Sequence, residues 1–207
     1  MTTGCGQGRC FSLVPSALRL LPLKTIDSFP IHIGSPSQDF TVLVATGSQH
    51  TYVPVADDCQ RINRTDCGAS RGVSIFGNRQ SPGFQSNASS TWQLIGLYEI
   101  GVNEVLGYSG NGITGYDSVG FRSTTTGDVK FLKQHIITAY ATPDLWVGQL
   151  GLGVKELIFR QDEHVSSFLE HLKDAGIIPS LSFGYTAGAS YRKHLIYCCS
   201  STHIANY

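Results

Sequence analysis

The chain has 207 residues, of which 41% are apolar and 14% are charged, so it carries enough apolar sequence to bury the core of one domain. Fifteen Lys and Arg residues balance fifteen Asp and Glu residues, which excludes a strong basic field for nucleic acid and an acidic field for cationic partners. The 23 glycines favour a turn-rich, all-β protein, because glycine suits left-handed turns and weakens helices.

The first clear pattern along the chain predicts a β-hairpin. Residues 31–33 alternate between apolar and polar side chains, residues 34–38 are typical turn residues, and residues 40–44 are mostly apolar and β-branched. We therefore expect two strands joined by a short turn at this point.

Residues 57–90 are polar and rich in Gly, Ser and Asn, which predicts a long surface excursion. Cys59 and Cys67 are eight residues apart and suggest a local disulfide. Two Asn-x-Ser/Thr sequons begin at Asn63 and Asn87, which makes these residues candidate glycosylation sites. Six cysteines together with two sequons indicate an oxidising secretory route, so we expect a secreted protein, extracellular or vacuolar. The pairing of the other four cysteines stays open: Cys5, Cys10, Cys198 and Cys199.

Further along, residues 92–100 and 113–121 predict strands that flank the Gly-rich segment 107–112, so a second hairpin is expected there. Residues 131–139 predict another strand. Residues 165–175 predict a short amphipathic helix, because four apolar side chains fall on one face and a glycine follows directly.

These elements suggest one folded unit over residues 26–191, preceded by a poorly defined segment (1–25) and followed by an irregular tail (192–207). No apolar run approaches the roughly 20 residues of a membrane-spanning helix. The histidines and cysteines lack the spacing of a metal site, so neither a metal nor another cofactor is expected.

The segment from Gly110 to Gly115 matches the G-x-G-x-x-G fingerprint of dinucleotide-binding loops. That fingerprint requires a helix directly after it, whereas the following residues 116–121 are strand-like. We interpret these glycines as part of a hairpin.

An ordered series of short segments is more specific. An Ile-Gly-x-Pro-x-Gln turn at residues 33–38 is followed by an apolar strand, then by Ala45-Thr46-Gly47-Ser48 and Tyr52-Val53-Pro54. This series resembles the N-terminal signature of the pepsin-like aspartic proteases (peptidase family A1), which carry Asp-Thr-Gly-Ser after that strand. Segments similar to later parts of the family's first lobe follow in the same order: 89–92, 106–112, 115–119, 147–153 and 168–183.

The resemblance implies a pepsin-like acid-protease fold, here a single N-terminal lobe of orthogonally packed sheets with one or two short helices and without the C-terminal lobe. In this family two aspartates, one from each lobe, share a proton and activate a water molecule. Ala45 occupies the position of the first aspartate and can neither accept a proton nor hold the water. Asp39, Asp57 and Asp117 are weighed as replacements, but none lies in the loop that presents the catalytic group. Peptide hydrolysis is therefore not expected.

The same resemblance implies a peptide-binding site and an extended peptide or protein segment as its partner, because a flap can close over such a peptide and bond its backbone. Tyr52 takes the family's Trp position, where it either supports the flap Tyr108 or packs in the core. The residues implied in peptide binding come from the loop and the flap: Thr46, Gly47, Ser48, Tyr108, Ser109 and Gly110.

Three functions remain open at this point. The first is an inactive pepsin-like homologue, or pseudoprotease, that binds peptides. The second is an aspartic-type endopeptidase by descent, truncated or altered in this chain, and the third is a secreted structural or interaction domain. A lobe alone exposes the face that a second lobe would cover, so a homodimer or the missing C-terminal lobe is a candidate partner. A homodimer would present Ala45 twice and would not restore the chemistry.

Overall fold

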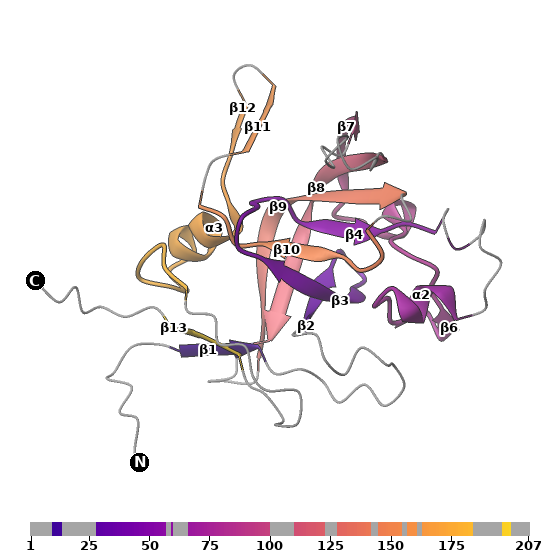
Figure 1. The fold of residues 1–207 in the computed structure, drawn as a ribbon, viewed down its shortest axis with the longest axis horizontal. Coiled ribbons are helices and arrows are strands. Elements are labelled where there is room, and N and C mark those ends of the chain that lie inside the picture. The colour runs from indigo at the N-terminus through magenta and orange to yellow at the C-terminus, as the bar shows by residue number, and fades with distance from the viewer. Residues whose placement is uncertain are drawn as a thin grey trace, which may run out of the picture.

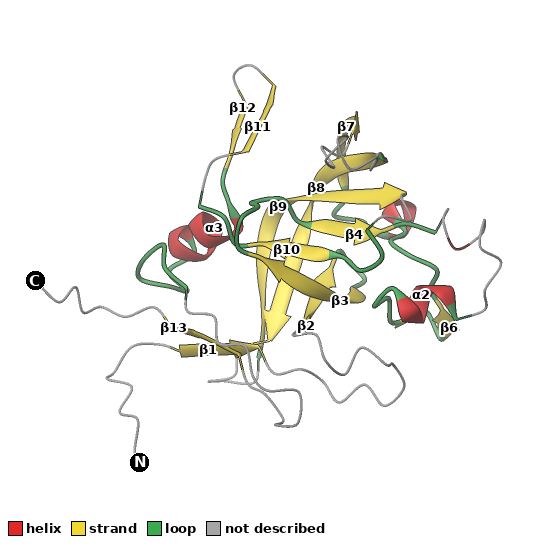
Figure 2. Ribbon diagram, viewed as in Figure 1, coloured by secondary structure: helices red, strands yellow, loops and turns green. Residues whose placement is uncertain are grey.

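The computed structural model describes residues 10–13, 28–56, 59, 66–99, 110–122, 128–141, 145–154, 157–160, 163–183 and 196–199. Strands dominate these residues and only two short α-helices accompany them (Figure 2), which confirms the all-β prediction. The strands are β1 (Cys10–Leu13), β2 (Ser28–Ile33), β3 (Gln38–Ala45), β4 (Tyr52–Pro54), β5 (Ile75–Phe76), β6 (Arg79–Gln80), β7 (Gln93–Glu99), β8 (Asn111–Arg122), β9 (Val129–Ala141), β10 (Gln149–Gly151), β11 (Leu157–Arg160), β12 (Glu163–Val165) and β13 (Ile196–Cys199). The helices are α2 (Cys67–Ser70), α3 (Phe168–Asp174) and the 3₁₀ turn η1 (Ser86–Ala88).

The main sheet has seven strands in the order β2-β3-β10-β4-β9-β8-β7, and its pairings are mixed (Figure 1). Strand β10 runs parallel to β3, and β4 runs parallel to β9, whereas the neighbouring hairpins are antiparallel. An additional pairing between β2 and β8 joins the first strand of this order to the sixth. Six strands therefore curl into a closed, barrel-like arrangement, and β7 remains at the edge.

The predicted first hairpin is confirmed. Strands β2 and β3 pair antiparallel from Ser28↔Leu43 to Ile33↔Gln38. Alternate residues of β2 are buried, because successive side chains of a strand point to opposite faces. The buried face of this hairpin contributes Ile31, Ile33, Phe40 and Val42 to the main core.

The excursion between β4 and β7 contains the predicted disulfide between Cys59 and Cys67. It is less superficial than expected, because the segment folds back against the sheet and buries several side chains, among them Arg71, Val73 and Phe84. Two glycines allow this close approach. A Cβ on Gly68 would lie 1.9 Å from the carbonyl oxygen of Ser81, and one on Gly83 would lie 2.3 Å from the carbonyl carbon of Val55.

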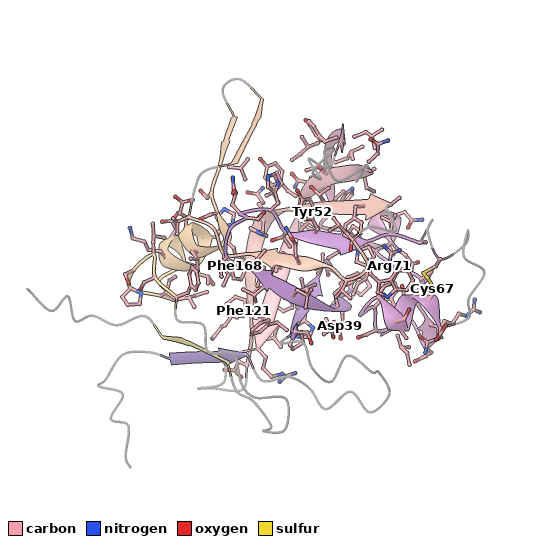
Figure 3. All side chains as sticks on the ribbon, in the orientation of Figure 1. Asp39, Tyr52, Cys67, Arg71, Phe121 and Phe168 are labelled. Carbon is pink, nitrogen blue, oxygen red and sulfur yellow. A yellow bond between two sulfur atoms is a disulfide. The ribbon has the colours of Figure 1, made fainter. Side chains whose placement is uncertain are left out.

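Arg71 is the largest fully buried side chain of this region, and Figure 3 shows it close to Cys67 at the α2 end of the molecule. Its Nε donates a hydrogen bond to the Trp146 carbonyl (3.2 Å) and its Nη1 donates one to the Val55 carbonyl (3.4 Å). The guanidinium also lies 5.5 Å from the ring centroid of Trp146, and the indole Nε1 of Trp146 donates to the Ser70 carbonyl (2.9 Å). These contacts tie the excursion to the segment that leads into β10.

The second hairpin, β7–β8, and the strand β9 confirm the remaining strand predictions. Residues 111–122 form a strand, so the helix that a dinucleotide fingerprint requires does not follow the glycines. Strand β9 lies in the interior of the sheet, between β4 and β8.

Helix α3 begins three residues later than predicted. Val165 belongs to β12, and Ser167 forms a capping box with Glu170, which starts the helix at Phe168. The predicted apolar face is correct in Phe168, Leu169 and Leu172, which are buried, and Gly176 ends the helix region with a φ of 66°.

Three two-stranded sheets lie outside the main sheet: β5–β6, β11–β12 and β1–β13, of which the last joins the segments 1–25 and 192–207. Strands β1 and β13 pair antiparallel, with Cys10 opposite Cys199 and Phe11 opposite Cys198. None of the helices in the described part of the chain is long and apolar enough to cross a membrane.

Candidate functional site

The loop that follows β3 carries the residues implied in peptide binding. Ala45 is the last residue of β3 and is half-buried, Thr46 and Gly47 form an exposed turn, and Ser48 is half-buried. The Ala45 carbonyl accepts a hydrogen bond from the Leu152 amide (2.9 Å), and the Ser48 carbonyl accepts one from the Gly153 amide (2.9 Å). The loop is therefore held at both ends by the residues that follow β10.

Ser48 organises the inside of this loop. Its Oγ accepts a hydrogen bond from the backbone amide of His50 (3.1 Å) and a longer one from Nε2 of Gln149 (3.4 Å). The same Gln149 nitrogen donates to the carbonyl of His50 (3.3 Å). A neutral amide and a neutral hydroxyl thus bridge β10 and the loop beside Ala45.

The loop can lie this close to β10 because two glycines, Gly151 and Gly153, lie opposite its backbone. Gly151 pairs with Ala45 in the parallel register, and a Cβ on Gly151 would lie 2.3 Å from the carbonyl carbon of Gln49. A Cβ on Gly153 would lie 2.9 Å from the carbonyl carbon of Ser48. Gly47 differs, since a Cβ there would meet nothing within 4 Å.

Two aromatic rings stack at the far end of the loop. The rings of His50 and Tyr52 are parallel, with centroids 5.5 Å apart, and Tyr52 meets Tyr140 edge-on at 6.2 Å. Burial lowers the pKa of His50 and raises the pKa of Tyr52 to about 12, so both rings are uncharged at neutral pH. Tyr52 therefore packs on the aromatic cluster of β4 and β9, as one of its two interpretations predicts.

Thr51 connects the loop to the interior of the sheet and to helix α3. Its Oγ1 lies 3.1 Å from Nε2 of His135 on β9, and Nδ1 of His135 lies 3.3 Å from Nδ1 of His171 on α3. Thr51 and His135 are both buried, while His171 is half-buried. Burial and then the neighbouring His171 lower the pKa of His135 from its ordinary 6.5 to about 3.

The two described aspartates that were weighed as replacements lie elsewhere. Asp39 is near the other end of β3, about 20 Å along the strand from Ala45, and accepts hydrogen bonds from Ser37 and His32. The hydrogen bond to His32 lowers the pKa of Asp39. Asp117 is buried, and its Oδ1 accepts hydrogen bonds from Thr91 and from the Ser118 amide. Both carboxylates are parts of the scaffold: Asp39 lies beside the turn between β2 and β3, and Asp117 lies within β8.

The structure brings together only part of the predicted site. Thr46, Gly47 and Ser48 lie in one loop, and Gly110 directly precedes β8. The described residues contain no group of three His, Cys, Asp or Glu side chains that could hold a metal ion. Asn87 is exposed in η1, as a glycan acceptor must be. Four further predicted residues lie outside the described part of the chain: Asp57, Asn63, Tyr108 and Ser109.

Two residues of the site were missed in the sequence. Gln149 is a polar residue inside an otherwise apolar and glycine-rich segment, and that contrast was the available signal. His135 follows a β-bulge, since its neighbours shift register between Asp117 and Val119 of the opposite strand. No local pattern in the sequence indicates that a bulge would direct His135 towards α3.

One of the comparisons with known proteins gives a match. A family model described as eukaryotic aspartyl protease matches residues 28–193, which is most of the chain. A search of curated proteins finds no match.

Proposed function

Because the chain belongs to the eukaryotic aspartyl protease family, we propose that it is a catalytically inactive member that binds an extended peptide at the loop of residues 45–50. Pepsin-like domains bind peptide substrates, and residues 45–48 match the family's Asp-Thr-Gly-Ser except at Ala45, which supports this loop as the candidate site. The single observation that carries the proposal is Ala45 at the end of β3 in an otherwise ordered loop.

The absence of hydrolysis follows from the chemistry of that position. A methyl group offers no lone pair to a water molecule and no proton to a leaving group. Loss of one general acid or base reduces catalysis by about 10²- to 10⁴-fold, and loss of the group that also positions the water costs more. Asp39 and Asp117 do not compensate, since each is engaged in hydrogen bonds away from the loop.

Peptide binding is supported by what the loop retains. Two backbone hydrogen bonds and the Gln149 side chain hold residues 45–50 in one conformation, so the loop is organised before a ligand arrives. A preorganised loop spends little conformational entropy on binding. The exposed backbone at Thr46 and Gly47 offers donors and acceptors for an extended peptide.

The test uses the purified full chain with a fluorescent library of extended peptides. We expect saturable binding and no cleavage at about pH 3 to 5, the range in which a carboxylate dyad works. Gln149→Ala should weaken binding, whereas His32→Gln, which alters a hairpin residue far from the loop, serves as the matched control. Cleavage that an aspartic-protease inhibitor blocks would establish the endopeptidase instead. No binding to any peptide would favour the structural or interaction domain.

The proposal extends to the cellular setting. Members of this family are typically secretory or vacuolar, and we propose the same for this chain, with glycans on Asn87 and Asn63. The disulfide between Cys59 and Cys67 supports an oxidising compartment. A homodimer or a C-terminal lobe as the partner of the exposed face remains part of this proposal and is tested by the molar mass in solution.

A further inference from the structure

The contacts of His135 suggest a role beyond packing. His135 itself belongs to the interior strand β9. It contacts Thr51, which follows the loop of the candidate site, and His171, which lies on helix α3. The ring of Phe168, also on α3, packs edge-on against the His135 ring with centroids 5.4 Å apart. We call Thr51, His135 and His171 the histidine latch.

We infer that the histidine latch is an acid-sensitive device that holds α3 against the sheet at neutral pH and releases it, together with the Thr51 side chain, as the pH falls. The inference concerns the docking of α3 and does not depend on peptide binding.

The hydrogen bond between the two histidines of the latch depends on how many protons they carry. The contact between the two Nδ1 atoms requires one nitrogen with a proton and one with a free lone pair. A neutral pair or a singly protonated pair satisfies this requirement, whereas two imidazolium rings would place N–H against N–H. The Thr51 hydroxyl can donate or accept, so it adapts to either tautomer of His135.

The surroundings keep the interior ring neutral. His135 is fully buried, and the only described ionisable side chain that it contacts is His171. Its cross-strand neighbour by backbone register is Asp117, whose Oδ1 accepts hydrogen bonds from Thr91 and from the Ser118 amide. Burial therefore has the largest effect. In the closed form, in which α3 is docked on the sheet, the pKa of His135 is about 3.

His171 connects the latch to solvent. It lines a pocket of about 370 Å³ together with residues of β7, β8, β9 and β12, and protons reach it there. Burial lowers the pKa of His171, and the charges of Asp174 and Glu170 on its own helix oppose this effect. Lys133 on the sheet side of the pocket is the described cation that faces it. The pocket residues are Gln93, Tyr116, Lys133, Gln134, Val165 and His171.

Helix α3 is the part that can move. It has seven residues and is held by three buried apolar side chains, whereas β9 is hydrogen-bonded on both sides by β4 and β8. Figure 1 shows α3 on the outside of the curled sheet, where it contacts β9. Undocking of α3 exposes His135 without breaking the sheet, which is typical of local opening at the periphery of a fold.

The direction of the pH effect follows from linkage. In the open form, in which α3 is undocked, His135 regains an ordinary pKa of 6.5. Below that pH the open form binds a proton, whereas His135 in the closed form stays neutral. With a pKa of about 3 in the closed form, the opening equilibrium of α3 rises by about 70-fold between pH 7 and pH 4.5.

Hydrogen exchange of the full chain measures this opening. The reporters are the α3 amides, such as His171, which bonds to the Ser167 carbonyl, and the reference is the Gly34 amide, which bonds to the Ser118 carbonyl. After correction for intrinsic exchange, we expect α3 protection to fall by about 70-fold from pH 7 to pH 4.5, while the hairpin reference changes much less.

His135→Gln is the decisive variant, because its amide can still bond to Thr51 and His171 but does not titrate. We expect the fall in α3 protection to shrink in this variant to the part that His171 contributes, well below the wild-type fall, and to persist in full in the matched control His32→Gln. An α3 protection that is independent of pH in the wild type, or a full fall in His135→Gln, would overturn the inference.

A second measurement serves if His135→Gln does not fold. By NMR, the imidazole carbon-bound protons of wild-type His135 should show no titration with a midpoint near 6.5, because the ring takes up a proton only when α3 is undocked. A titration midpoint near 6.5 in the folded protein would show that His135 takes up its proton without any opening, and the latch would be excluded.

Discussion

The sharpest test of the site geometry is the substitution Gly151→Ala. The added Cβ would lie 2.3 Å from the carbonyl carbon of Gln49 and 2.7 Å from the amide nitrogen of His50, and both are backbone atoms that no rotamer change can move. Ordinary contact begins at 3.4 Å, so the loop and β10 must separate by about 1 Å. That separation stretches the bonds by which the Leu152 and Gly153 amides hold the loop.

The expected cost combines two effects. Overpacking of this kind costs about 1 to 3 kcal/mol, and a weakened backbone hydrogen bond adds about 1 kcal/mol. We therefore expect Gly151→Ala to lower the free energy of unfolding by about 3 kcal/mol, which corresponds to about 9 °C in Tm for a chain of this size.

Urea unfolding followed by intrinsic fluorescence measures this loss, and the same loop provides the control. Gly47→Ala adds the same methyl group where nothing lies within 4 Å, so its stability should stay within about 0.5 kcal/mol of the wild type. Equal stability of Gly151→Ala and the wild type would mean that the loop does not approach β10 as described.

Three further predictions concern the scaffold. The free energy of unfolding should fall by about 2.5 kcal/mol between pH 7 and pH 4.5, because the lowered pKa of His135 gives stability that is present above pH 6.5 and lost below it; urea titrations at both pH values measure this, and a constant value would contradict it. Replacing both Cys59 and Cys67 by Ser should cost about 2.5 kcal/mol by the loop-closure relation, and an unchanged urea midpoint would argue against the bond. Arg71→Lys should cost about 2 to 3 kcal/mol in the same assay, because one ammonium cannot serve both carbonyls of the guanidinium fork, and a loss below about 0.5 kcal/mol would refute that role.

Local patterns predicted those elements whose stabilising contacts are themselves local. The hairpins β2–β3 and β7–β8 follow from alternation and turn residues, and the disulfide between Cys59 and Cys67 follows from their short spacing. The helix was predicted with its correct buried face, but its start was wrong because the apolar Val165 continues the periodic pattern by chance while Ser167 provides the cap. A capping residue therefore outweighed hydrophobic periodicity at this boundary.

The parallel pairings of β10 with β3 and of β4 with β9 were beyond such reasoning. They join segments about 100 and 85 residues apart in the chain, and no local signal reports which strands meet. The partners of Arg71 and His135 have the same origin, since each contact crosses between elements that only the complete sheet brings together.

The sequence by itself determined the family, the positions of the two hairpins along the chain and the alanine at position 45, because these depend on residue identity and on spacing along the chain. Only the tertiary structure decided how the loop around Ala45 is held. Gln149 hydrogen-bonds it to β10, the missing side chain of Gly151 leaves room for its backbone, and Thr51, which follows the loop, contacts His135. These contacts depend on distances of a few ångströms between segments far apart in the chain, and such distances are set when the whole sheet closes.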